Sequence, residues 1–170
     1  MTSENPFDIQ RGFPRRRALF FIAYREPLGP FGERSTMHLA EIITSVIHAA
    51  GNLDVSGEDW LSTPGNVAIV LPNDDIALFD DNEDEQGVYQ GHLLFKSRGQ
   101  EAIESAKECF RRMFADHGAS VIYGLIPPDR RDVKLLLRWA GAKSRGERYT
   151  IHGLVELFVL SKDMWKGSLT

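Results

Sequence analysis

The chain has 170 residues, a length that suits one domain with a single sizeable core. Apolar residues make up 42% of it, which excludes a disordered or low-complexity chain. It carries 20 basic and 24 acidic residues and a net charge of −4, so it has no overall positive field to hold nucleic acid or an anionic membrane. Any site for an anion must therefore be formed locally.

The cysteine, the histidines and the longest apolar run indicate the compartment and the kinds of site to expect. The single cysteine, Cys109, cannot form an internal disulfide or a cysteine-based zinc site, and it suits a reducing compartment. The histidines show no pair at helical spacing, so no metal site is predicted. The apolar run at residues 18–24 (ALFFIAY) is too short for a signal peptide or a membrane span. We therefore expect a protein of the cytoplasm without a metal or a membrane anchor.

The first half of the chain predicts an arm, a strand and a helix. Residues 1–17 carry two prolines and little periodicity, which is typical of an N-terminal arm, and residues 18–170 are predicted to form one domain. A strand is predicted at residues 18–24. Ser35 or Thr36 then caps a helix that reaches Ala50, because apolar residues recur there at spacings of three and four. A loop that holds Trp60 follows.

The second half predicts a sheet with crossing helices. Strands are expected at residues 67–71, 76–79, 88–96, 121–126, 142–144 and 149–160, with an acidic connection at 80–86 and helices over about 99–117 and 129–140. The strand–helix–strand unit over 88–126 places its two strands parallel, whereas tight turns make the earlier strands antiparallel. The predicted fold class is α+β: a mixed, mostly antiparallel sheet with helices on its faces.

The turn between the long strand and its crossover helix carries a chemical signal. It has the sequence FKSRGQEA at residues 95–102. A helix N-terminus leaves backbone N–H groups unpaired, and a glycine before it lets an anion approach the backbone closely. Lys96 and Arg98 would add positive charge. The turn suits a phosphate site, although the same pattern also fits an ordinary strand-to-helix connection.

The element order and this turn make the chain resemble the GNAT family of acyl-CoA-dependent N-acetyltransferases. Their pyrophosphate loop follows a long central strand and opens the next helix. The resemblance covers about residues 18–165, and it is closest to the GNAT-like proteins of tailed bacteriophages, which look similar to YQGHLLFKSRGQEAIESAKECF (89–110) and IPPDRRDVKLLLRWAGAK (126–143). It implies an acyl-CoA N-acyltransferase fold in which the parallel strands at 88–96 and 121–126 splay apart.

The resemblance also implies a cosubstrate, acetyl-CoA, and an amine acceptor that is either a protein or a small molecule. Its pyrophosphate would lie on the turn and its pantetheine arm in the gap between the splayed strands. The implied cofactor contacts are Leu94, Phe95, Lys96, Arg98, Gly99, Gln100, Glu101, Ala102 and, from the second segment, Arg130 at the family's usual asparagine position.

Three side chains are candidates for proton transfer in such a reaction. His92 is the candidate base, because it lies on the strand that lines the cleft and its pKa class suits proton transfer near neutrality. A histidine satisfied by a backbone carbonyl or by solvent would look the same in the sequence. Tyr123 and Tyr149 are candidate acids, and each also fits a packed aromatic residue. Cys109 is predicted to be buried on the apolar face of its helix rather than to act as a nucleophile.

A second interpretation stays open beside the enzyme. If the family's loop pattern starts at Arg98, Glu101 and Ile103 occupy positions where the family has glycine or alanine; if it starts at Lys96, Gly99 fits and only Glu101 departs. Leu137 stands at the position of a tyrosine that often protonates the leaving thiolate. A GNAT-like domain without catalysis, serving as a structural or interaction component of a phage particle or a host-protein complex, fits these residues. Residues 1–17 would then meet a second copy, a virion protein or a host protein.

Overall fold

The structure, a computed structural model, describes residues 36–49, 53–151 and 153–167. The predicted N-terminal arm (1–17) and the strand predicted at 18–24 lie outside the described residues. In chain order the elements are α1 (Thr36–Ala49), α2 (Gly57–Ser62), β1 (Val67–Val70), β2 (Ile76–Asp81), β3 (Val88–Leu94), α3 (Gly99–Asp116), β4 (Val121–Ile126), α4 (Arg131–Trp139), β5 (Lys143–Thr150), β6 (Gly153–Ser161) and a short 3₁₀ turn, η1 (Lys162–Met164).

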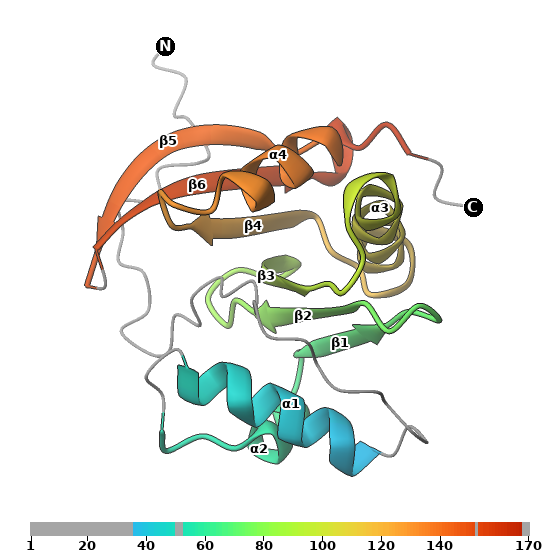
Figure 1. The fold of residues 1–170 in the computed structure, drawn as a ribbon, viewed down its shortest axis with the longest axis vertical. Coiled ribbons are helices and arrows are strands. Elements are labelled where there is room, and N and C mark those ends of the chain that lie inside the picture. Colours follow the sequence, from blue (N-terminus) through green and yellow to red (C-terminus); the bar gives the residue numbers. More distant parts are fainter. Residues whose placement is uncertain (1–35, 50–52, 152, 168–170) are drawn as a thin grey trace.

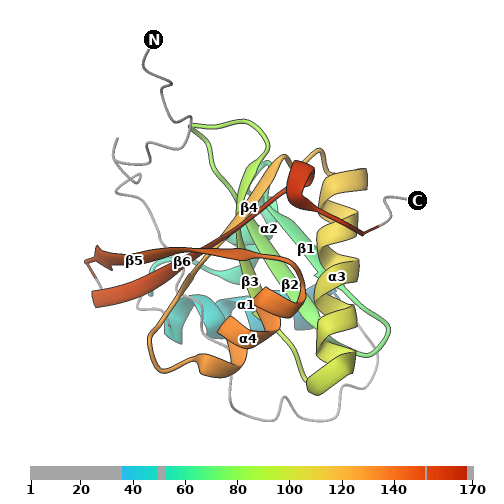
Figure 2. The ribbon, with the colours of Figure 1, turned by 90° about the horizontal axis from the view of Figure 1, so that it is seen from above.

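The described strands form one mixed sheet in the order β1-β2-β3-β4-β6-β5. Only β3 and β4 are parallel, and α3 is the crossover between them, as the sequence predicted. The other neighbours pair antiparallel. The β5–β6 hairpin extends beyond the remaining strands (Figure 2). This arrangement confirms the α+β prediction of a mostly antiparallel sheet with one parallel pair.

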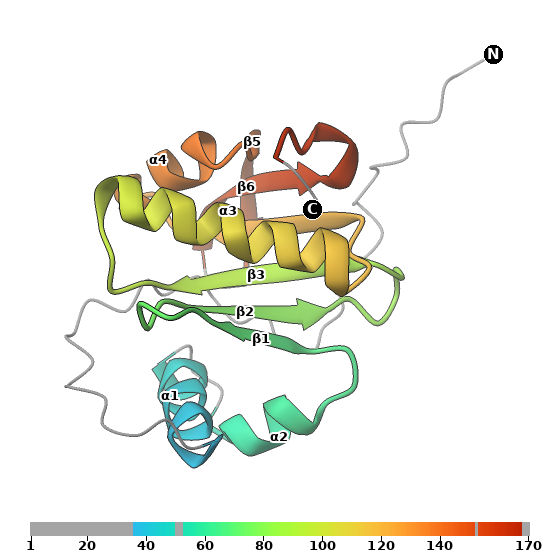
Figure 3. The same cartoon turned by 90° about the vertical axis from the view of Figure 1, so that its right-hand side faces the viewer.

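Two hydrophobic clusters cover opposite faces of the sheet. One lies between the sheet and the α3 and α4 helices, with Phe110 and Phe114 of α3 almost fully buried. The other packs α1 and Trp60 of α2 against β2 and β3. Figure 1 shows the two helix pairs well apart, and in Figure 3 α1 and α2 lie together beyond β1, away from α3 and α4. Alternate residues of β2 and β3 therefore face different helices.

Four predicted elements differ in the structure. Residues 57–62 form the short α2 rather than a loop, because Ser56 and Asp59 make a reciprocal capping box: the Asp59 N–H donates to Ser56 Oγ at 3.1 Å and the Ser56 N–H to Asp59 Oδ2 at 3.1 Å. The predicted strand at 149–160 is broken at residue 151, where β5 turns into β6. Because β5 is exposed along nearly its whole length, it shows no apolar alternation in the sequence.

The third difference is at β2, which runs to Asp81, two residues into the predicted acidic connection. The fourth is at β3, which ends at Leu94 rather than at Lys96. The backbone N–H groups of Lys96 and Ser97 donate to the carboxylate of Asp75 instead of continuing the ladder. Helix α1 ends at Ala49 beside the predicted stop, and α3 and β4 keep their predicted positions to within one residue. Among the described helices, none is both long and apolar enough to cross a membrane.

Candidate functional site

The parallel strands β3 and β4 stay together over only a short distance. Their pairing covers three residue pairs, from Val88 opposite Val121 to Gln90 opposite Tyr123. Beyond Gln90, β3 pairs with β2 alone, while β4 continues along β6 to Ile126. The two strands therefore part in the direction of the turn that leads into α3. On its β4 side, the end of β3 has no strand partner among the described residues.

A groove of about 790 Å³ lies on the α3 and α4 side of this opening. The end of β3, the first turns of α3 and the segment that enters α4 form its walls. Its lining mixes apolar and charged side chains: Leu93, Phe95, Ser97, Arg98, Gly99, Ala102, Ile103, Asp129, Arg130, Asp132, Val133, Leu135, Leu136 and Trp139. A groove of this size is in the range of small-molecule sites.

A buried carboxylate shapes the turn between β3 and α3. Asp75, from the turn between β1 and β2, is fully buried. Its Oδ1 accepts the N–H of Lys96 at 2.8 Å and of Ser97 at 3.0 Å, and its Oδ2 accepts from the Ser97 hydroxyl and from Asn73 Nδ2. Because one side chain satisfies both consecutive amides, the course of the backbone into Gly99 is fixed.

The N-terminus of α3 opens on the groove. Gly99 has a φ of +58°, and no atom lies within 4 Å of where its Cβ would be. No side chain of the described residues caps the helix at Arg98. The Arg98 guanidinium instead donates to the carbonyls of Phe95 and Ser97, both at 2.8 Å, and brings its charge to the groove. An anion there would meet a cation and the first N–H groups of a helix.

Two further charged side chains of the groove, Arg130 and Asp132, pair with each other. The Arg130 side chain donates to Asp132 from Nε at 3.0 Å and from Nη2 at 2.8 Å, and this hydrogen bonding holds the pKa of the Asp132 carboxyl below its usual value. Glu101 accepts from Asn73 Nδ2 at 3.2 Å and is not part of the groove lining. The anionic side chain at this family position is therefore held on the side of α3 that faces the β1–β2 turn.

Behind the splay, on the face of the sheet turned toward α2, lies a buried polar contact. His92 is 2% exposed, and its Nε2 lies 2.6 Å from Asp80 Oδ2. The other carboxylate oxygen of Asp80 accepts a short hydrogen bond from the Trp60 indole. In the tautomer that carries its proton on Nε2, the ring donates to Asp80 and Nδ1 carries the lone pair. The imidazole is thus held by a carboxylate, a partner that the sequence did not indicate.

The two candidate tyrosines lie in different places. Tyr123 points to the same face as His92, since it stands opposite Gln90, two residues before the histidine. Burial, and secondarily the charges of Asp80 and Glu85, raise the pKa of Tyr123 to about 12, so its hydroxyl stays protonated at neutral pH. Tyr149 is 87% exposed on the β5–β6 hairpin, opposite Leu154 and beyond the end of β4. The structure places His92 and Tyr123 on the same face of the sheet and Tyr149 on the exposed hairpin.

The groove gathers most of the residues implied for the cofactor. Phe95, Arg98, Gly99, Ala102 and Arg130 line it. The groove is not lined by the other four. Lys96 lies in the turn, Gln100 and Glu101 in the first turn of α3, and Leu94 is buried toward α1.

Sequence reasoning missed two kinds of contributor to the site. The apolar wall from α4, chiefly Leu136 and Trp139, is one, although helical spacing could have indicated it. Asp75 and Asp80 are the other, since they act from other strands and turns.

Cys109 is fully buried, as predicted, and burial raises the pKa of its thiol to about 12. Within residues 39–49, 53–151 and 153–167, no group of three or more histidine, cysteine, aspartate or glutamate side chains is arranged to hold a metal ion.

Comparisons with known proteins define the fold. No family model matches the chain, and no curated protein matches its sequence. Among solved structures, it is similar to the aminoglycoside acetyltransferase AAC(6')-Ib in complex with coenzyme A and kanamycin, with a TM-score of 0.52, 15% identity, and coverage of 75% of this chain and 89% of that one. It is also similar to the spermidine N-acetyltransferase SpeG from Vibrio cholerae, with a TM-score of 0.51 and 6% identity over 65% of this chain and 73% of that one.

A third similar structure is RimJ from Mycobacterium smegmatis in complex with CoA-disulfide, with a TM-score of 0.50 and 10% identity over 56% of this chain and 50% of that one. At these identities the likeness concerns the fold. The chain has a GNAT-like fold: a mixed six-stranded sheet with flanking helices. The fold expected from the resemblance in the sequence is therefore confirmed.

Proposed function

We propose that this protein transfers an acetyl group from acetyl-CoA to an amine. The observation that carries the proposal is the groove of about 790 Å³ that runs from the N-terminus of α3 to Leu93, in the part of β3 that no longer pairs with β4. A long, flexible thioester with a charged pyrophosphate needs such a shape: an anion site at one end and a narrow apolar opening at the other. The GNAT-like fold, shared with structures of acetyltransferases, supports the same function.

Different residues of the groove suit different parts of the cosubstrate. The N–H groups of Gly99, Gln100 and Glu101 are the first of α3 and suit the pyrophosphate, with Arg98 and Arg130 beside them. The pantetheine arm has amide groups, and the end of β3 offers backbone donors and acceptors on the side where it has left β4. The thioester would then lie at the parting of the strands, beside Leu93.

On the opposite face of the sheet, His92 and Tyr123 suit the two proton transfers. The nitrogen of an uncharged amine attacks the thioester carbon, so that a C–N bond forms and the C–S bond breaks. The amine proton passes to Nδ1 of His92, directly or through water, and the leaving sulfur takes a proton from the Tyr123 hydroxyl. Proton exchange between the two groups and solvent restores both. Tyr149 has no role in this proposal because its ring lies on the hairpin.

A thiol-release assay with acetyl-CoA and a panel of amines tests the proposal. We expect His92→Gln to lower kcat by about 10²–10⁴, which is the usual contribution of a general base, with little change in acetyl-CoA affinity. His117→Gln is the matched control, since His117 is exposed at the far end of α3. Equal kcat values for the two variants would show that His92 is not the general base. No turnover with any amine would contradict the proposal that the protein is an enzyme.

One observation favours a second candidate, an interaction protein without catalysis. Leu137 is 5% exposed in the core, so the family position of the acid tyrosine holds an apolar, packed side chain. Such a domain would serve in a larger assembly, for example a phage particle or a host-protein complex, with residues 1–17 as the contact. Light scattering of the chain with and without residues 1–17 tests this candidate: a monomer in both forms, with robust turnover, contradicts it.

A further inference from the structure

A small cavity continues the groove into the opening between the strands. Its volume is about 20 Å³, the size of a single water molecule or methyl group. Leu93 lines both the cavity and the large groove, so the two spaces adjoin at the end of β3. On the strand side it is bounded by Gly91 of β3 and Gly124 of β4, near the last β3–β4 pair.

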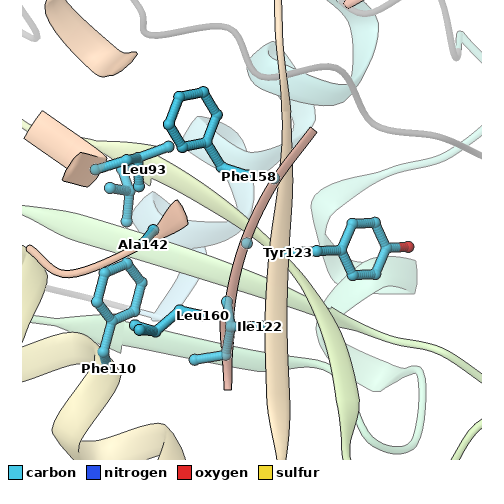
Figure 4. Close-up of a pocket in the computed structure, with 10 residues that line it drawn as sticks. Leu93, Phe110, Ile122, Tyr123, Ala142, Phe158 and Leu160 are labelled. Carbon is cyan, nitrogen blue, oxygen red and sulfur yellow. The ribbon is translucent and has the colours of Figure 1, made fainter. Parts of the chain in front are cut away.

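Large packed side chains close the other sides of the cavity. Phe110 of α3 is 2% exposed, and Phe158 and Leu160 of β6 are 1% exposed. Figure 4 shows these side chains on one side of the opening, while the ring of Tyr123 points away from them. The Arg138 guanidinium lies 5.6 Å from the centroid of the Phe158 ring, on which it stacks as a cation. This wall cannot yield without repacking the main core.

On the strand side, the cavity exists because Gly91 has no side chain. A Cβ at Gly91 would lie 3.2 Å from Phe79 Cε1 and 3.3 Å from Ile122 Cγ2, which is already tight contact. The cavity is therefore open only to a very small group at the place where the proposed function puts the thioester.

We propose that this wall limits the length of the acyl chain, so that acyl-CoA thioesters longer than the acetyl donor of the proposed function are excluded. Phe110, Phe158 and Leu160 are the specificity-determining residues. The inference rests on the proposed function, because it assumes that the thioester reaches Leu93. A two-carbon acyl group places one methyl in the cavity, whereas each further methylene must displace packed core atoms. In hydrophobic pockets one methylene changes kcat/KM by about 10–200-fold.

The wild-type protein gives the first test. Binding of CoA, acetyl-CoA, propionyl-CoA and butyryl-CoA is measured by calorimetry, and transfer is followed with the best amine acceptor. We expect acetyl-CoA to bind at least as well as CoA, and kcat/KM to fall at least about tenfold from acetyl to propionyl and again to butyryl. Equal use of all three thioesters would overturn the inference while leaving acyl transfer intact. If neither CoA nor any of the thioesters binds, both the proposed function and this inference are contradicted.

A pair of leucines on β6 gives the second test. Leu160 and Leu157 are 1% and 2% exposed, but Leu160 lines the cavity whereas Leu157 packs on the opposite face of the sheet. We expect Leu160→Ala to raise the propionyl-to-acetyl ratio of kcat/KM at least about tenfold and Leu157→Ala to leave that ratio unchanged. The ratio does not depend on how much protein is folded. An equal ratio in both variants would overturn the assignment of Leu160, and if Leu160→Ala does not fold, Phe158→Leu is measured in its place with the same expectation.

Discussion

Replacing Asp75 with alanine is predicted to loosen the turn that carries the proposed pyrophosphate site. The substitution removes the acceptor for two backbone N–H groups, those of Lys96 and Ser97, and for the Ser97 hydroxyl. Asp75 is 0% exposed, so water does not readily replace it. An unsatisfied buried donor costs about 1–3 kcal/mol, so three of them give a loss of at least about 3 kcal/mol. For a chain of this size that lowers Tm by about 6–12 °C.

Two further variants make the Asp75 prediction specific. Asp75→Asn keeps the shape but turns one acceptor into a donor, and we expect it to lose about 1–2 kcal/mol and to weaken acetyl-CoA binding at temperatures where it is folded. Asp74→Asn is the control: its carboxylate is about one-third exposed, lies 3.6 Å from Lys96 Nζ, and contributes little. Asparagine also tolerates the φ of +66° at this position. Thermal unfolding that does not distinguish Asp75→Ala from Asp74→Asn would refute the reasoning.

Three other predictions follow from contacts at the groove and in the core. Arg98→Ala is expected to weaken acetyl-CoA binding about 10–100-fold in calorimetry, since a charge-assisted hydrogen bond contributes about 1.5–3 kcal/mol, and an effect no larger than that of Lys107→Ala would contradict this. Hydrogen bonds from Lys134 and Ser144 lower the pKa of Glu156 below its usual 4.5, so its ionised carboxylate stabilises the fold above pH 4.5 and this stability is lost as the pH falls through the lower folded pKa. In urea unfolding measured across acid pH, Glu156→Gln should make the free energy of unfolding depend less on pH. The same pH dependence in both proteins would refute this. The Cys109 thiol should react with a disulfide reagent only after denaturation, because it is buried and its pKa is raised to about 12; fast labelling of the native protein would be inconsistent with that burial.

The core-facing elements were predictable because their side chains obey simple periodicities. Helix α3 buries one stripe that includes Ala106, Phe110 and Met113, and its sequence shows that spacing directly. Strand β5 could not be found this way, since nearly all its residues are exposed and only its pairing with β6 makes it a strand. Helix α2 depends on one capping box in a stretch of only six helical residues. The sequence thus predicts elements that bury one face, whereas an exposed element shows no apolar periodicity.

The candidate site was predictable only where it is continuous in the sequence. The turn at residues 95–102 combines strand end, glycine and helix start, and the groove opens there. The partners that fix its geometry come from elsewhere: Asp75 lies 22 residues before Ser97, and Asp80 lies 12 residues before His92. Such pairs depend on strand register, which a single sequence does not specify. The direction of Glu101 likewise depends on Asn73, a residue of the β1–β2 turn.

Backbone NMR during a titration with acetyl-CoA tests the central claim most directly. If the groove between α3 and α4 holds the cosubstrate, the amide signals of Gly99, Gln100 and Glu101 and those of residues 93–95 should shift together and saturate at a common concentration. The amides of the β5–β6 hairpin should not shift. No shift at millimolar acetyl-CoA, or shifts confined to residues outside the groove, would contradict the account.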